Sequence, residues 1–126
     1  MTEVLSIGTY AAMDAQALRA EFGGPELPAL ADLDSLPQAA RDAVIAMACK
    51  SHEALGPAQM DKLPNLKLIA RYGVGYEAVD LAAAAARGIT VTNTPDVLND
   101  DVADLGVAIW LGLLREVERG IANVRS

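Results

Sequence analysis

The stretch LKLIARYGVGYEAVDLAAAAARGITVTN (66–93) decides the fold that this sequence predicts. Its apolar start, residues 66–72, is typical of a buried β-strand, and a glycine-containing turn follows. The alanine run 81–88 indicates a helix that Gly88 ends, and residues 89–93 (ITVTN) indicate a second strand. A strand, a helix and a second strand in this order predict a βαβ unit with two parallel strands.

The same alternation is found upstream of this unit. We expect strands at residues 4–8 (VLSIG), 28–33 (PALADL) and 43–48 (AVIAMA), and a helix at residues 14–22. Pro57 lies just inside a further short helix, where its missing N–H costs nothing. The pattern predicts an α/β fold: a flavodoxin-like parallel sheet of about five strands with helices on both faces.

The sequence changes character near its C-terminal end. An acidic start at residues 99–101 suits the positive end of a helix dipole, and the helix from Val102 to Leu114 is apolar nearly all round. A helix that is apolar on every side is normally buried on every side, so we expect a covering partner. We therefore divide the chain into a flavodoxin-like domain at 1–98 and a partner-seeking helix and tail at 99–126.

Composition excludes several classes of function. The chain has 126 residues with 10 Lys and Arg against 17 Asp and Glu, a net charge of -7 that argues against nucleic acid and anionic membranes as partners. The single cysteine, Cys49, excludes an internal disulfide framework and fits a reducing compartment. The N-terminal residues lack a basic segment, and no apolar run is long enough to span a bilayer. We expect a soluble, cytoplasmic protein.

The turn GVGYEA (73–78) is the first candidate for chemistry, and three interpretations stay open. Its G-x-G-x-x-A pattern is a variant of the dinucleotide fingerprint, in which the backbone approaches a pyrophosphate. It is also compatible with a plain tight turn that binds nothing. The third interpretation is a nest of backbone N–H groups that holds a small carboxylate. The intervening YEAVD and the bulky Tyr76 argue against a bound pyrophosphate, and of the other two interpretations we favour the nest.

The segment from Leu63 to Arg125 resembles the substrate-binding domain of the D-isomer-specific 2-hydroxyacid dehydrogenases. The resemblance is strongest to the glyoxylate/hydroxypyruvate reductase branch, whereas the residues before Leu63 fit more loosely. The matching elements, in order, are the strand ending in GVGY (73–76), the acid of AVD (78–80), the strand and turn RGITVTNTP (87–95) and the helix start VADL (102–105).

This resemblance implies a substrate site. The backbone N–H groups of Val74 and Gly75 would hold the carboxylate of a small 2-oxo or 2-hydroxy acid, with Gly73, Tyr72 and Tyr76 beside them. It also implies NAD or NADP as the cofactor of the intact enzyme. The family's Arg, His and Glu for catalysis, and its glycine-rich phosphate loop, belong to the part that follows this segment.

We therefore expect no catalytic, cofactor-binding or metal-binding residue in this truncated chain, and no dehydrogenase activity from it alone. Its expected partners are the small acid and either the missing cofactor domain or a second copy that forms a dimer through the 102–114 helix. The alternative is a stand-alone module of the same fold, which binds a small acid or dimerises without catalysis.

Three other features receive structural interpretations. His52, with Lys50 and Glu53 nearby, is expected to be an exposed loop histidine rather than a base paired with its neighbour. Cys49 is expected to be a small buried apolar residue. Asp100 and Asp101 are explained by helix capping and the dipole, and Asp104 by a polar neighbour, without a metal.

Overall fold

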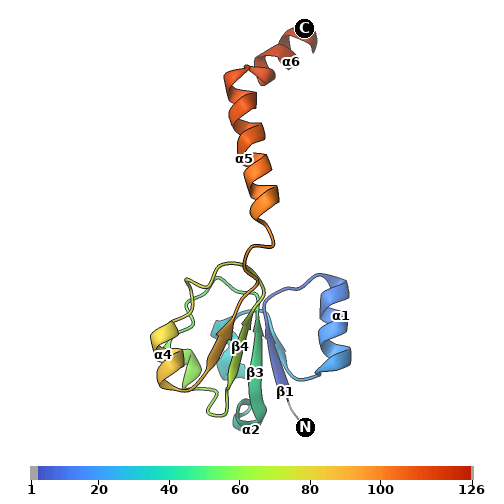
Figure 1. The fold of residues 1–126 in the computed structure, drawn as a ribbon. Coiled ribbons are helices and arrows are strands. Elements are labelled where there is room, and N and C mark those ends of the chain that lie inside the picture. The colour runs from blue at the N-terminus through green and yellow to red at the C-terminus, as the bar shows by residue number, and fades with distance from the viewer. Residues whose placement is uncertain (1–2, 126) are drawn as a thin grey trace. The chain divides into compact units, whose positions relative to one another are not determined.

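The computed structural model describes residues 3–125, and the chain forms a first unit that ends at Pro95 and a second that begins at Asp96. The first unit is built on a five-stranded parallel sheet in the order β2-β1-β3-β4-β5 (Figure 1). This is the strand order of flavodoxin-like domains, so the predicted fold class is confirmed. The strands are β1 (Glu3–Ile7), β2 (Glu26–Leu27), β3 (Val44–Cys49), β4 (Leu68–Arg71) and β5 (Thr90–Thr92).

Helices connect these strands, and α1 and α4 lie on opposite sides of the sheet in Figure 1. Pro57 occupies the first turn of its helix, as its missing N–H predicts. Asp80 caps α4, because its carboxylate accepts a 2.8 Å hydrogen bond from the Ala83 N–H. The helices of this unit are α1 (Ala12–Glu21), the 3-10 helix η1 (Leu30–Ser35), α2 (Gln38–Ala43), α3 (Pro57–Met60) and α4 (Leu81–Ala86).

The strand expected at residues 28–33 was wrong, because this segment enters the 3-10 helix η1. Leu30 and Leu33 are three residues apart, so the 3-10 period places both on one side, where both are buried. The Leu30 N–H donates to the carboxylate of Glu53, a long-range bond that no local sequence pattern predicts. The second strand is instead the short β2, which pairs with the end of β1.

The core lies on the side of the sheet that faces η1, α3 and α4. Fully buried residues of three strands, among them Leu5, Met47 and Ile69, belong to one cluster with residues of these helices. Helix α1 contributes no buried residue to the core, and Ala46 and Ala48 of β3, whose side chains lie on the face opposite Met47, are only half-buried. Because parallel sheets are normally covered on both faces, this second face is incompletely covered within the described residues.

The second unit consists of α5 (Asn99–Leu114) and α6 (Val117–Arg125). They are separated at Glu116, whose φ of 50° is left-handed and does not continue a helix. The apolar side chains of α5 are exposed in the described structure, with Trp110 at 62% and Leu113 at 74%. No helix described between residues 3 and 125 combines the length and apolarity that a membrane span requires.

Candidate anion-binding site

The GVGY loop (73–76) leaves β4 at the carboxyl edge of the sheet. The strands β1, β3 and β4 are parallel neighbours, so all three end at this edge. The Tyr72 N–H extends the pairing by donating to the Cys49 carbonyl at 3.0 Å, and Gly73 then turns the chain with a φ of 149°, which side chains disfavour. Ligands of open α/β sheets bind at this edge, so the loop occupies the expected position for a site.

Two successive backbone donors of the loop are uncommitted. Among residues 3–125, neither the Val74 N–H nor the Gly75 N–H donates a hydrogen bond to a protein atom. Val74 is 37% exposed and Gly75 is partly exposed, so water or a solute can reach this part of the loop. Two successive free N–H groups in a turn are donors that a small anion accepts from.

The carbonyl groups of the same loop, by contrast, are hydrogen-bonded to the protein. Three consecutive carbonyl oxygens accept bonds from residues on β4 and beyond β5. The donors are the Thr94 N–H to Gly73 at 3.0 Å, the Asn93 Nδ2 to Val74 at 2.8 Å and the Arg71 Nε to Gly75 at 3.3 Å. The protein therefore holds the carbonyl side of the loop and leaves donors at positions 74 and 75 open.

Arg71 places a buried positive charge behind the loop. The residue is only 8% exposed, and its Nη1 donates to the Ser51 carbonyl and, at 3.4 Å, to the Cys49 sulfur. No carboxylate among the described residues forms an ion pair with it. Its charge is thus met by neutral acceptors only and contributes a positive field beside the loop. The expected burial of Cys49 is confirmed.

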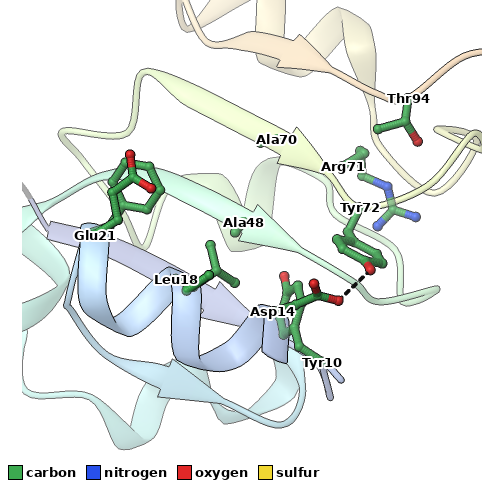
Figure 2. Close-up of a pocket in the computed structure, with 11 residues that line it drawn as sticks. Tyr10, Asp14, Leu18, Glu21, Ala48, Ala70, Arg71, Tyr72 and Thr94 are labelled. Atoms are coloured by element: carbon green, nitrogen blue, oxygen red, sulfur yellow. Dashed lines mark hydrogen bonds between the residues drawn. The ribbon is translucent and has the colours of Figure 1, made fainter. Parts of the chain in front are cut away.

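Tyr72 turns toward α1 rather than over the loop. Its hydroxyl donates a 2.8 Å hydrogen bond to Asp14, which raises the pKa of the phenol (Figure 2). Its ring meets Tyr10 edge to face at 5.3 Å, and the Lys50 ammonium lies 4.9 Å from the ring centroid. Tyr72 lines a cavity of about 360 Å³ between α1 and the open face of the sheet.

Tyr76 lies at a different hollow. It lines a space of about 160 Å³ together with Leu81 and Asn93, and its carbonyl accepts the Val79 N–H at 2.9 Å. Neither this hollow nor the 360 Å³ cavity is lined by Val74 or Gly75. The structure therefore places four of the five predicted site residues in the loop and Tyr72 directly before it, but does not close the two tyrosine rings over the loop's donors.

Three residues outside the predicted site lie near the loop. Glu77 approaches Gly75 closely: a Cβ at position 75 would lie 2.7 Å from its Oε2, so a negative charge sits beside the expected anion site. Asn93 and Arg71 hold loop carbonyls. The nearness of Glu77 in sequence was the only local signal, because the other two reach the loop through sheet pairing.

The loop does not fit a dinucleotide phosphate. In that motif the glycines lead directly into a helix N-terminus, whose free N–H groups bind the pyrophosphate. Here residues 76–80 separate the glycines from α4, and Asp80 already caps that helix with its own carboxylate. A nicotinamide cofactor therefore finds no phosphate cradle at this turn.

The alternative site at His52 also lacks the required geometry. His52 is exposed, and no described residue forms a hydrogen bond or ion pair with it. Glu53 instead accepts hydrogen bonds from the Leu30 N–H and the Ser51 hydroxyl. Within residues 3–125 no group of three or more metal-ligating side chains is gathered. Of the candidate sites that the sequence indicated, the loop is thus the one whose backbone donors are free for a ligand.

The fold and this loop define an α/β domain with a flavodoxin-like sheet and open backbone donors at its carboxyl edge. Residues 4–119 match the family described as D-isomer specific 2-hydroxyacid dehydrogenase, catalytic domain. The chain belongs to this family, as the resemblance indicated.

Individual relatives agree with this assignment. A glyoxylate reductase of Pyrococcus horikoshii is 48% identical over 66 residues, which are 52% of this chain and 20% of that protein. A solved 2-hydroxyacid dehydrogenase from Ketogulonicigenium vulgare is 44% identical with a TM-score of 0.77, covering 93% of this chain and 37% of that one. A Sinorhizobium meliloti NADPH-dependent glyoxylate/hydroxypyruvate reductase was solved with NADP and malonate. It is 34% identical with a TM-score of 0.76, and the match covers 94% of this chain and 37% of that one. This chain therefore corresponds to only a minor part of the length of its relatives.

Proposed function

We propose that the chain is the substrate-binding segment of an NAD(P)-dependent D-2-hydroxyacid dehydrogenase that reduces a small 2-oxo acid of the glyoxylate/hydroxypyruvate class. Family membership supports the reaction type, since residues 4–119 match the family. The names of the relatives support the substrate class, and the NADP in one solved relative supports the cofactor of the intact enzyme.

The observation that carries the proposal is the pair of free N–H groups at Val74 and Gly75. Two amide donors side by side match the two oxygens of a carboxylate, and the buried Arg71 charge favours an anion there. Tyr72, Gly73 and Tyr76 flank these donors in the proposed site. Anchoring the carboxylate fixes the direction of the carbonyl carbon, which is what a hydride transfer needs from a binding segment.

NAD(P), when bound in an intact enzyme, supplies the hydride, and the turn at residues 73–80 does not fit its phosphates. Glu53 is engaged by the Leu30 N–H and the Ser51 hydroxyl, so it does not orient His52 as a base. We therefore expect the 126-residue chain to show no turnover of glyoxylate with NADH or NADPH. Loss of nicotinamide absorbance that saturates with cofactor would contradict this expectation.

The test of the binding site is a titration of the ¹⁵N-labelled chain with glyoxylate, followed by NMR. The amide resonances of Val74 and Gly75 should move together and saturate, because both donors contact the carboxylate. Glycolaldehyde, which is similar in size but has no carboxylate, is the control and should leave both resonances in place. Unmoved Val74 and Gly75 resonances at saturating glyoxylate would overturn the proposed site.

A second candidate function is assembly, and the exposed apolar surface of α5 favours it. Apolar residues on α5 have no cover in the described structure, among them Leu105, Ile109 and Trp110. Such a surface binds a second domain or a second copy of the chain. If the chain dimerises through residues 102–114 but does not bind glyoxylate, it is the stand-alone, non-catalytic module.

A further inference from the structure

The orientation of the free donors is set by bonds on the other side of the loop. In a trans peptide group the carbonyl of one residue and the N–H of the next point in opposite directions. A bond that holds the Val74 carbonyl therefore also fixes the direction of the Gly75 N–H. Likewise, a bond to the Gly73 carbonyl fixes the Val74 N–H.

We propose that Asn93 is a positioning residue of the anion-binding loop: its side-chain amide holds the Val74 carbonyl and so directs the Gly75 N–H away from the protein, toward a bound carboxylate. The bond from Asn93 Nδ2 to the Val74 oxygen is 2.8 Å long. This inference rests on the proposed function, because it concerns the same carboxylate site.

Sheet pairing explains why position 93 reaches the loop. Strand β5 pairs with β4 in parallel, with Ala70 opposite Thr92. The same register carried one residue further places Asn93 beside the end of β4, where the loop begins. An amide side chain of this length donates to a carbonyl, whereas an alanine has no donor there.

The neighbouring carbonyls are held in the same way but by less removable groups. Thr94 uses its backbone N–H to hold the Gly73 carbonyl, and no side-chain substitution that keeps this N–H tests that bond. Arg71 holds the Gly75 carbonyl at 3.3 Å, but its removal also deletes a buried charge. Asn93 is therefore the position at which orientation can be changed alone.

A donor held in place before binding loses less conformational freedom when the ligand arrives. Removing Asn93 frees the peptide group between Val74 and Gly75 to rotate, so the Gly75 N–H must be ordered by the ligand. The loss of one such net hydrogen-bond contribution corresponds to binding that is about tenfold weaker. The charge of the site is unchanged, because asparagine is neutral.

The experiment compares glyoxylate binding by the wild-type chain, Asn93→Ala and Asn65→Ala. Asn65 is a matched control, since its Nδ2 also donates to a backbone carbonyl, that of Asp42 at 2.7 Å, but before β3 and β4 rather than after them. We expect N93A to bind glyoxylate about tenfold more weakly and N65A to bind as the wild type does. Asn93→Gln keeps the amide donor and should lose less glyoxylate affinity than N93A. It replaces N93A in the comparison if N93A does not fold.

A second measurement needs no ligand. A scalar coupling across the hydrogen bond, from Asn93 Nδ2 to the Val74 carbonyl carbon, should be present in the wild-type chain. Absence of this coupling, or equal glyoxylate affinity of N93A and wild type, would overturn the role of Asn93. A wild-type chain with the coupling but without any glyoxylate response would instead contradict the proposed function.

Discussion

The hydroxyl of Tyr72 donates a 2.8 Å hydrogen bond to the carboxylate of Asp14, and this bond ties the segment after β4 to α1. The phenol must be neutral to donate, so the bond and the negative charge of Asp14 raise the pKa of Tyr72. The bond thus links two segments that are distant in sequence, at the edge of the sheet where the anion-binding loop begins.

Asp14→Asn should lower the pKa of Tyr72 toward its ordinary value, because the charged acceptor is lost. The alkaline absorbance titration of the tyrosines measures this change. Asp32→Asn removes the same charge from η1 and is the control, for which the Tyr72 titration should stay as in the wild type. An unchanged titration in D14N would contradict the role of the Asp14 bond.

Stability should fall at alkaline pH. Burial raises the pKa of Tyr10 to about 12, and the pKa of Tyr72 is also raised. Groups whose pKa is raised in the folded state contribute stability that is complete below the unfolded value, about 10 for tyrosine, and is lost as pH rises through the folded value. Urea denaturation between about pH 9 and 12 should show this decline, and Tyr10→Phe should flatten it. A decline of the same steepness in Y10F would contradict the assignment to Tyr10.

Glu77→Gln should strengthen glyoxylate binding. The Glu77 carboxylate lies beside Gly75 and repels an incoming carboxylate, so its neutralisation should lower Kd about threefold at low salt. The gain should shrink as salt screens the charges. Glu3→Gln, at the opposite end of the strands, makes the same change in net charge and should alter Kd little. Equal effects of the two variants would show that only net charge matters.

Arg71→Met should lower the free energy of unfolding by about 2 kcal/mol. The substitution leaves the Ser51 and Gly75 carbonyls without their charged donor, although removing a buried charge that has no acid partner returns part of its desolvation cost. Urea denaturation measures the change. Arg19→Met removes an exposed ion pair with Glu26 and should have little effect by the same measurement. If R71M is as stable as the wild type, the bonds from the guanidinium to the Ser51 and Gly75 carbonyls do not stabilise the fold.

Trp110→Glu should weaken self-association of the chain. A charge in the middle of the exposed apolar surface of α5 opposes the burial of that surface between copies. Sedimentation over a range of concentrations should show a wild-type chain heavier than a monomer and a W110E chain that is closer to one. Met13→Glu changes an exposed apolar residue on α1 and should leave association unchanged. A wild-type monomer at all concentrations would rule out this surface as a contact between copies.

Much of the fold could be predicted because it depends on local periodicity. The apolar runs at β1, β3 and β4, the helix that ends before Gly88 and the proline at the start of α3 are visible within a few residues of sequence. The prediction of a strand at residues 28–33 was wrong for a physical reason. Its 3-10 helix is supported by the burial of Leu30 and Leu33 and by a bond to Glu53. The residues that bury these leucines and the carboxylate that accepts the bond lie in other parts of the chain.

The sequence by itself determined where the candidate site lies: a strand that ends in GVGY must deliver its turn to the carboxyl edge of a parallel sheet. Only the tertiary structure decided which way the groups of that turn point, because the bonds that orient them come from other strands. Asn93 and Arg71 hold carbonyls of the loop, and the Tyr72 hydroxyl donates to Asp14. These contacts depend on strand register and packing. Such contacts form between residues that are far apart in the chain, so no local pattern encodes them.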